Sequence, residues 1–397
     1  MISVTQARKL IVQHVNPLPS QSIPLARVHG RVLREPLLAS EDMPPFDRSA
    51  VDGYVIREDD SADEFDVIGE IRAGEAIDRP LQPGQTIRIL TGARLPAQNL
   101  SVIMQEQVEI CDGRMRILKR GGPGNVRKKG EDARAGEVLL ESGITLEAIS
   151  VALLASVGKT FSLVSRQAKI LHLTTGDEIV PPEQTPAPGQ IRNSNASLIA
   201  SLCREQGIEE ILHLHAQDDL KTMIDLVTQA KPETYDLILI SGGSGPGTYD
   251  FSADLFRHLG ATIHFREVNV RPGKPLIFGT SSSQVVFGLP GNVLSHFVCF
   301  QLFVRVALDR LLGRTTPTAT RALLVETMGE TMNARETWWP ARAEWREGRL
   351  ECRALPWKSS GDITRMSAAN ALIQVPASTP RLMTGTLVDL LLTQLSF

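Results

Sequence analysis

The stretch Leu237-Ile238-Leu239-Ile240-Ser241-Gly242-Gly243-Ser244-Gly245-Pro246-Gly247-Thr248-Tyr249-Asp250 indicates how this chain folds. Four apolar residues precede a glycine-rich turn, and an amphipathic segment, Phe251 to Leu259, follows it. This order predicts a strand, a turn and a helix. Glycines let a backbone approach a ligand closely, and the start of a helix attracts anions. The turn therefore predicts a phosphate site, and the carboxylate of Asp250 beside it suggests a bound metal ion.

The glycine turn has a simpler interpretation as a tight connection between strand and helix, and from this stretch alone the two interpretations weigh equally. Its spacing differs from the dinucleotide-binding pattern G-x-G-x-x-G. It also lacks the Gly-Lys-Ser/Thr of a Walker A loop, as does the loop Arg271 to Pro275, in which proline follows the lysine.

Length and composition exclude several classes of protein. A chain of 397 residues predicts two to four domains. A net charge of −3 and an aromatic content of 5% disfavour a nucleic-acid partner. The chain has no apolar run of membrane-spanning length and no signal peptide, so we expect a cytoplasmic protein without a membrane partner. Four widely spaced cysteines predict reduced, packed thiols.

Strands alternate with helices in the second half of the chain. This pattern predicts a parallel sheet with helices on both faces and with ligand loops at the carboxyl ends of its strands. The predicted strands are Lys169 to Thr174, Ile208 to His215, Leu237 to Ile240 and Val285 to Leu289. The predicted helices are Asn193 to Gln206, Leu220 to Ala230 and Val293 to Leu311.

Charged residues gather in the loops at these strand ends. The carboxylates of Asp177, Glu178, Asp219 and Asp250 could hold Mg²⁺ beside a phosphate, although Asp218 or Asp219 could instead cap the next helix. Arg271 and Lys274 flank Gly273 in a proline-rich loop. They predict either a phosphate partner or a salt-bridged surface loop.

The flanking regions are rich in short strands. Ser3 to Val15 and Ile144 to Val157 read as helices, with Thr145 as a cap, and they bracket a β-module from about Val55 to Glu137. The arrangement predicts one body interrupted by an insertion. The tail predicts a small β-barrel, with its four tryptophans in the barrel core. The predicted strands are Phe65 to Ile71, Thr86 to Leu90, Ser101 to Gln105, Met115 to Leu118, Ala322 to Glu326, Leu350 to Ala354, Ala371 to Val375 and Leu387 to Leu392.

Two polar loops of the insertion allow two interpretations each. The loop Asp47 to Tyr54 presents carboxylates either to a ligand or to its own turn, and the turn is modestly favoured. The loop Asn125 to Asp132 places three cations beside two carboxylates. It reads as an oxyanion site or, more simply, as a charged hairpin edge.

Taken together and in order, the motifs of this chain resemble those of the MoeA family, the molybdopterin molybdenumtransferases, which include the E domain of gephyrin. The resemblance covers essentially the whole chain. The motifs are Pro44-Pro45-Phe46-Asp47-Arg48-Ser49-Ala50-Val51-Asp52-Gly53-Tyr54, Thr91-Gly92-Ala93-Arg94-Leu95-Pro96, Val102-Ile103-Met104-Gln105-Glu106, Gly130-Glu131-Asp132, Thr175-Gly176-Asp177-Glu178, Asn193-Ser194-Asn195, Pro272-Gly273-Lys274-Pro275, Gly288-Leu289-Pro290-Gly291-Asn292, Ser359-Ser360-Gly361 and Ala368-Ala369-Asn370-Ala371-Leu372.

The resemblance implies a multidomain α/β and β protein. It implies an elongated linking domain over 1–40 and 141–166 and a β-rich inserted domain over 41–140. A three-layer molybdopterin-binding α/β domain would follow over 167–314, and a C-terminal β-barrel over 315–397. It also implies a homodimer, with each site formed by the α/β domain of one chain and the β-rich insertion of the other.

The implied reaction inserts molybdate into adenylyl-molybdopterin in the presence of Mg²⁺ and releases AMP. A molybdopterin adenylyltransferase and apo-molybdoenzymes are the implied partners. By match to the family's motifs, Asp52, Thr91, Asp132, Glu178 and Asp250 are implied as catalytic, and Glu178, Asp219 and Asp250 as metal ligands. The implied cofactor-binding residues are Gly242, Gly243, Ser244, Gly245, Asp219, Arg271, Lys274, Pro290 and Arg127.

The chain departs from the family pattern at two ligand loops. Gly245 stands where the family's glycine turn has a serine, and Val293 follows Asn292 where the family has proline. Loss of a hydroxyl and of a rigid proline would weaken a pterin site, although Pro246 restores stiffness. Two alternatives to a transferase follow: a carrier of molybdopterin or of the finished cofactor, and a dimeric scaffold. The retained carboxylates argue against the scaffold.

Overall fold

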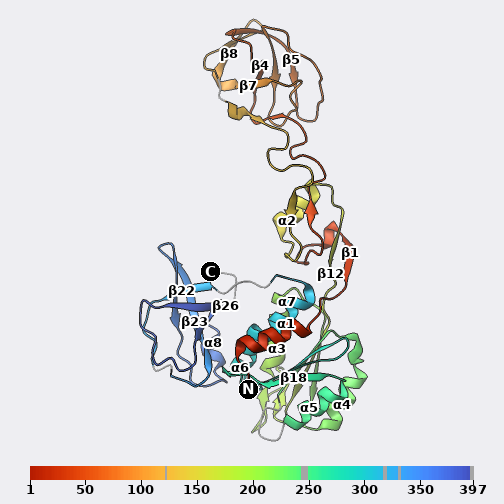
Figure 1. Cartoon of the computed structure of the whole chain (residues 1–397), viewed down its shortest axis with the longest axis vertical. Coiled ribbons are helices and arrows are strands. Elements are labelled where there is room, and N and C mark those ends of the chain that lie inside the picture. Colours follow the sequence, from red (N-terminus) through yellow and green to blue (C-terminus); the bar gives the residue numbers. More distant parts are fainter. Residues whose placement is uncertain (121–122, 243–248, 316–319, 330–331, 394–397) are drawn as a thin grey trace.

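The computed structural model describes residues 1–120, 123–242, 249–315, 320–329 and 332–393. The molecule is elongated (Figure 1). A β-sheet of residues 53–117 lies at one end, and an α/β body with the C-terminal β-barrel beside it lies at the other. A narrow region around α2 (Ala148–Ser156) connects the two ends.

The α/β body is built on a six-stranded sheet of order β16-β13-β17-β21-β20-β18. Its first four strands are parallel, as predicted. Two strands were not predicted, and β20 runs antiparallel to both of its neighbours. Only four residues separate β20 from β21, too few for the crossover that a parallel pair requires. The bounds are β13 Ile170–Thr175, β16 Ile211–Ala216, β17 Leu237–Ser241, β18 Thr262–Glu267, β20 Pro275–Thr280 and β21 Val285–Leu289.

Helices cover both faces of this sheet, which gives the predicted three layers. In β17, Leu237 and Leu239 face one hydrophobic core, whereas Ile238 and Ile240 face the other. The first core is closed by α1 (Val4–His14), α3 (Ser194–Glu205), α6 (Val293–Cys299) and α7 (Arg305–Leu312). The second core is closed by α4 (Leu220–Gln229) and α5 (Tyr249–His258).

The predicted helix starts hold in most places but fail at α2. Helix α1 begins with a capping box at Ser3, and α3 is capped by Asn193. The predicted helix over 293–311 is α6 and α7, joined by a π-helical segment, Phe300–Val304. The start predicted for α2 is wrong, since Thr145 forms a β-bridge with Val32 rather than a cap. The backbone there is already paired with the segment around residue 32, which excludes a helix.

The inserted sheet has the order β7-β4-β6-β5-β9-β8. Four of its strands confirm predicted ones, and two buried clusters hold its two faces. The bounds are β4 Gly53–Arg57, β5 Glu64–Ile71, β6 Gln85–Ile89, β7 Leu100–Met104, β8 Val108–Cys111 and β9 Arg114–Ile117.

The C-terminal strands form a closed β-barrel, because β25 pairs with β23 as well as with β26. The long strand β23 was not predicted, and its tryptophans do not all enter the barrel core as expected. Trp338 packs in the core shared with the α/β body, and Trp345 is 61% exposed. Successive side chains of a strand face opposite sides, so one strand cannot place all of its tryptophans inside. The bounds are β22 Thr320–Leu324, β23 Glu336–Arg346, β24 Arg349–Ala354, β25 Ala371–Val375 and β26 Leu387–Leu392.

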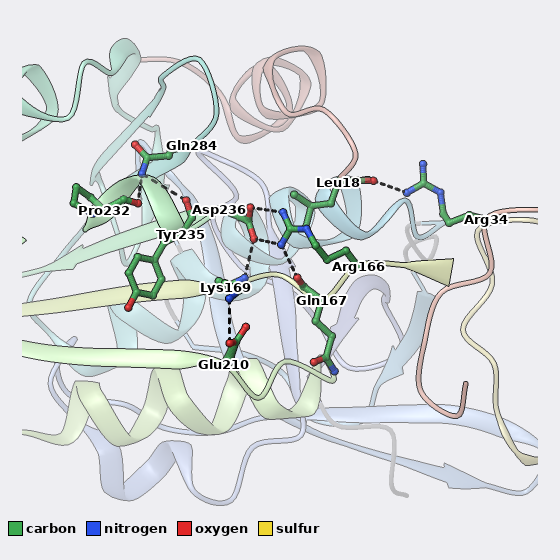
Figure 2. A network of polar contacts seen from close by, with 10 residues as sticks. All are labelled: Leu18, Arg34, Arg166, Gln167, Lys169, Glu210, Pro232, Tyr235, Asp236 and Gln284. Atoms are coloured by element: carbon green, nitrogen blue, oxygen red, sulfur yellow. Dashed lines mark hydrogen bonds and ion pairs between the residues drawn. The ribbon is translucent and has the colours of Figure 1, made fainter. Parts of the chain in front are cut away.

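The connecting region joins the α/β body through β1 (Ser20–Pro24) and β12 (Phe161–Ser165), which pair antiparallel. Just beyond β12, Arg166 makes two hydrogen bonds to Asp236, at 2.9 and 2.7 Å (Figure 2). The same carboxylate accepts the Lys169 backbone N–H at 2.9 Å. This contact ties the connection to the amino ends of β13 and β17, which leaves their carboxyl ends free for a ligand.

Candidate functional site

A cavity of about 420 Å³ lies at the carboxyl ends of β13, β17 and β21, where the sequence predicted the ligand loops. Short segments β14 (Ile179–Val180) and β15 (Ile191–Arg192) border it. Its lining is Thr174, Thr175, Gly176, Glu178, Ile179, Ile191, Asn193, Asn195, Asp218, Ser241, Gly242, Gly291 and Asn292.

A second cavity, of about 470 Å³, shares Ile179 and Asn193 with the first. Its walls are largely apolar, and His213 and His215 of β16 line it. The first cavity is the stronger candidate, because Gly242 and the carboxylates of Glu178 and Asp218 line it.

Two glycines allow the strand ends to come close together at the cavity. Gly242 has φ +112°, and a Cβ atom there would lie 2.6 Å from the Thr175 carbonyl oxygen. Gly176 has φ +142°, and a Cβ there would lie 2.7 Å from a carboxylate oxygen of Glu178. Neither backbone conformation suits a residue with a side chain. Glycine at these positions therefore shapes the wall of the cavity.

Three carboxylates lie together at the rim. Burial raises the pKa of Asp218, and the carboxylates of Asp177 and Glu178 raise it further, against an opposing hydrogen bond from Thr175. The Asp218 backbone N–H donates to Asp177 at 3.2 Å. Like charges that raise a pKa in this way favour a bound cation. Among the described residues, however, no group of three or more His, Cys, Asp or Glu side chains is arranged to hold a metal ion.

Asp218 lines the cavity, whereas the sequence singled out its neighbour Asp219. Asp219 caps α4, and its carboxylate accepts the backbone N–H and the hydroxyl of Thr222, both at 2.7 Å. These hydrogen bonds lower its pKa. The sequence contains two adjacent aspartates before the helix. The path of the backbone between β16 and α4 decides which of them lines the cavity and which caps the helix.

Part of the predicted glycine turn lies outside the described residues, namely Gly243, Ser244 and Gly245. Asp250 falls in the first turn of α5, and only its backbone is described. Their predicted roles in phosphate and metal binding therefore stay predictions.

Asparagines join the walls of the cavity, a role that the sequence did not assign to them. Asn193 donates to the Thr174 hydroxyl at 2.9 Å while it caps α3. Asn195 donates to the Gly291 carbonyl at 2.7 Å, and Asn292 donates to Ser360 of the barrel at 2.8 Å. The buried Asn195 amide oxygen has no hydrogen-bond partner within the described part of the chain. That oxygen is an acceptor available to a ligand.

The cationic loop predicted to bind phosphate is paired with other groups. The Arg271 guanidinium lies over the Trp357 ring, 5.2 Å from its centroid, and Lys274 contacts Glu267 at 3.3 Å. Neither residue is among those that line the cavity. Pro290 is buried, and its carbonyl accepts a hydrogen bond from His296 at 3.0 Å.

A second group of predicted residues lies at the edge of the inserted sheet. Asp52 accepts the backbone N–H and the hydroxyl of Thr91, both at 2.7 Å. These two hydrogen bonds lower the pKa of Asp52. Asp52 is thus held ionised and oriented by Thr91.

The nearby cations are paired with carboxylates. Arg127 contacts Asp132, and its Nε atom lies 3.2 Å from Glu131. Lys128 contacts Asp47 at 3.3 Å. An anion that binds here must therefore compete for these cations.

Within one chain the two groups of residues do not meet. Asp52 directly precedes β4 of the inserted sheet, which lies at the opposite end of the molecule from the α/β body that carries Glu178 (Figure 1). Asp132 contacts Arg127, whose neighbour Val126 packs in a core of the inserted sheet. A single site that uses both groups requires a second chain.

Comparison with known proteins finds a matching family model for three regions of the chain. Residues 2–158 match the MoeA N-terminal region (domain I and II), residues 172–310 a probable molybdopterin binding domain, and residues 331–393 the MoeA C-terminal region (domain IV). The chain is 30% identical over 403 residues to a molybdopterin molybdenumtransferase of Staphylococcus epidermidis strain RP62A, covering 99% of this chain and 96% of the relative.

Solved structures agree with these matches. Two structures of MoeA proteins of molybdopterin biosynthesis from Pyrococcus horikoshii have TM-scores of 0.80 and 0.83, with 32% and 28% identity. Each alignment covers 99% of this chain and 99% or more of the other. Similarity of sequence and fold along the whole length shows that this chain belongs to the MoeA family, the family of the molybdopterin molybdenumtransferases.

Proposed function

We propose that this protein inserts molybdate into adenylyl-molybdopterin, releases AMP and so forms molybdenum cofactor. The observation that carries the proposal is the cavity at the carboxyl ends of β13, β17 and β21, which combines glycine walls with a carboxylate rim. It lies in a chain that aligns over 99% of its length with a molybdopterin molybdenumtransferase.

In this proposal the substrate phosphates lie between the glycine wall and the start of α3. Helix α3 has 12 residues, and its first turn, with Asn193 as cap and Asn195, borders the cavity. The unpaired N–H groups of a helix N-terminus favour a phosphate. The Asn195 amide oxygen would accept a hydrogen bond from a polar edge of the substrate.

The carboxylate rim fits Mg²⁺. Mg²⁺ is usually held by one or two protein carboxylates together with substrate phosphates, so a preformed group of three ligands is not required. Glu178 and Asp218, which line the cavity, would hold it. Burial raises the pKa of Asp218, and the negative charges of Asp177 and Glu178 raise it further, a repulsion that a bound cation would relieve. When bound, the ion would neutralise charge on the phosphate oxygens.

We further propose a homodimer in which the inserted sheet of one protomer covers the cavity of the other. The separation of the two groups of predicted residues within one chain supports this arrangement. Asp52, oriented by Thr91, would then face the substrate of the partner. Arg127 and Asp132 would lie beside it, with the arginine available to an incoming oxyanion once its ion pairs open.

The remaining assignments follow from this function. A molybdopterin adenylyltransferase would supply the substrate, and apo-molybdoenzymes would take the product. We place the protein in the cytoplasm, where its four free cysteines would stay reduced. In the part of the chain that the structure describes, no helix is long and apolar enough to cross a membrane.

The test is AMP release from adenylyl-molybdopterin by the purified protein with Mg²⁺, with and without molybdate. Molybdate-dependent release, followed by reconstitution of an apo-molybdoenzyme, would support the proposal. Chelation of Mg²⁺ with EDTA should stop the release, and added Mg²⁺ should restore it. Tight binding of adenylyl-molybdopterin without release at saturating molybdate would overturn the transferase in favour of a carrier.

A further inference from the structure

Three fully buried polar side chains form a chain of hydrogen bonds beneath the cavity. His172 of β13, Ser241 of β17 and His296 of α6 are 0%, 1% and 0% exposed. His172 Nε2 lies 2.7 Å from the Ser241 hydroxyl oxygen, which lies 3.1 Å from His296 Nε2. His296 Nδ1 lies 3.0 Å from the Pro290 carbonyl oxygen. The chain of hydrogen bonds thus runs from the middle of β13 through the end of β17 to the loop after β21.

The Pro290 carbonyl fixes the tautomer of His296. A carbonyl oxygen can only accept, so His296 Nδ1 carries a proton and donates it. Burial lowers the pKa of His296 to about 4, so the ring is neutral at physiological pH. Its Nε2 atom therefore holds a lone pair and accepts from the Ser241 hydroxyl.

The direction of the remaining hydrogen bond then follows. The hydroxyl of Ser241 has one proton, which it donates to His296, so His172 must donate from Nε2. Burial and the two neighbouring histidines lower the pKa of His172 well below its usual value, so this ring is neutral as well. Its Nδ1 atom is then unprotonated, and it has no hydrogen-bond partner among the described residues.

His296 connects two walls of the cavity. Ser241 immediately precedes Gly242 on one wall, and Pro290 immediately precedes Gly291 and Asn292 on another. We propose that His296, as the Nδ1–H tautomer, is a positioning residue that holds these two walls at the spacing that the phosphate groups of adenylyl-molybdopterin require. This inference rests on the proposed function for the identity of the substrate.

The geometry favours positioning over nucleophilic catalysis by Ser241. A serine that donates to a histidine, which in turn donates to a carbonyl, has the order of groups found in an activated nucleophile. Here, however, the hydroxyl oxygen also accepts from His172, and the residue is 1% exposed. These two hydrogen bonds fix the orientation of the buried hydroxyl, so its role is to hold the end of β17.

The tautomers can be measured without any substrate. In protein labelled with ¹⁵N-histidine, long-range ¹H–¹⁵N correlation spectra distinguish Nδ1–H from Nε2–H rings. We expect one Nδ1–H ring that is lost in His296→Gln and one Nε2–H ring that is lost in His172→Gln. Neither ring should titrate between pH 8 and about 6, near the ordinary histidine pKa. An Nε2–H tautomer for His296 would overturn the inference.

Three substitutions of His296 separate its two hydrogen bonds. The shorter amide of His296→Asn can still donate to Pro290 but cannot reach Ser241, whereas His296→Gln can reach Ser241 but not Pro290. We expect each to raise the KM for adenylyl-molybdopterin about tenfold, and His296→Leu to raise it further, because each leaves a buried polar group unpaired. The kcat of AMP release should change less than about twofold, since the reacting groups remain in place.

Val298→Ala is the matched control. Val298 is fully buried on the same helix, so its truncation loosens α6 without removing either hydrogen bond. A KM that is unchanged in His296→Leu, or raised equally in Val298→Ala, would contradict positioning by His296. Loss of kcat without a change in KM in Ser241→Ala would make Ser241 a catalytic residue instead. If the wild type releases no AMP, the proposed function fails, while the tautomers still decide whether the hydrogen-bond chain exists.

Discussion

At the scale of single residues, Gly242 carries the strongest steric constraint in the cavity. A Cβ atom there would overlap the Thr175 carbonyl and hydroxyl, at 2.6 and 2.7 Å, and φ is +112°. We expect Gly242→Ala to lower the free energy of unfolding by at least about 2 kcal/mol and to weaken substrate binding. Urea unfolding and the KM for adenylyl-molybdopterin would measure the two effects.

Gly260→Ala serves as the comparison for this substitution. Gly260 has φ +65°, and a Cβ atom there would meet nothing within 4 Å. Gly260→Ala should therefore lower the free energy of unfolding by only about 1 kcal/mol, through backbone strain, and leave the KM unchanged. Equal losses in both variants would mean that strain alone, rather than overlap with Thr175, explains the glycine at 242.

Asp218 offers a test of the carboxylate rim. Its pKa is raised above the ordinary value of an aspartate, mainly by burial, so its ionised form destabilises the native state. We expect the wild type to lose stability relative to Asp218→Asn as the pH rises through the range above 3.8. Asp218→Asn should also lower Mg²⁺-dependent AMP release by at least about tenfold. Even residues that contact a metal only through its ligands can have an effect of this size. A variant that is less stable and fully active would exclude this role.

The sequence could predict the loops of the site but not which residues in them face the cavity. Asp218 and Asp219 are adjacent and chemically identical, and only the path of the backbone into α4 makes one a rim residue and the other a cap. Ser241 was visible only as the first residue of a glycine turn. Its partners His172 and His296 are 69 and 55 residues away in the chain, so no local pattern connects them.

At the scale of elements, the cap of α3 links helix stability to the cavity. Asn193 accepts the Ala196 N–H at 3.0 Å and donates to Thr174 at 2.9 Å. We expect Asn193→Ala to cost about 1 to 2 kcal/mol of unfolding free energy and to raise the KM for adenylyl-molybdopterin. Ser3→Ala removes the comparable cap of α1, and Ser3 is not among the residues that line the cavity, so this substitution should cost about 1 kcal/mol of unfolding free energy without changing the KM.

The buried histidine of α6, His296, makes the free energy of unfolding depend on pH. A histidine whose native pKa lies below its unfolded value stabilises the fold fully above the unfolded pKa, and this contribution is lost as the pH falls through both values. For His296 the window runs from 6.5 to about 4. The expected loss over this window is about 3 kcal/mol.

Urea unfolding between pH 7 and 4 would measure this loss, and His296→Asn should flatten part of the slope. His172, His213 and His264 also have lowered pKa values, mainly through burial, and add to the slope in the same direction. A free energy of unfolding that stays constant over this range would contradict neutral buried histidines.

Strands and helices with a clear hydrophobic pattern could be predicted from the sequence, whereas the pairing of strands distant in the sequence could not. The strands β17 and β21 are nearly continuous apolar runs, the signature of a strand buried on both faces, and β13 is buried along its whole length although it contains His172. β23 contains Pro340 together with arginines and glutamates, and its pairing with two strands of the barrel outweighs that local composition. The order of the sheet is likewise set by contacts distant in sequence.

At the scale of the whole molecule, the separation of the two groups of site residues gives the sharpest test of the dimer. Asp52 lies on the inserted sheet at one end of the chain, and Asp218 lies on the α/β body at the other (Figure 1). Homodimers of Asp52→Ala or of Asp218→Ala should each be nearly inactive, because both of their composite sites lack a carboxylate.

A mixed dimer of the two variants behaves differently if the sites are shared between protomers. One of its two sites combines the intact α/β body of the Asp52→Ala chain with the intact inserted sheet of the Asp218→Ala chain, and the other site carries both changes. Mixed dimers, isolated through two affinity tags, should therefore show about half of the wild-type rate of AMP release. If each chain contained a complete site, every site in the mixed dimer would lack one carboxylate and no activity would return. Sedimentation of the same sample verifies that the chains are dimeric, so absence of recovery would count against the shared site rather than against assembly.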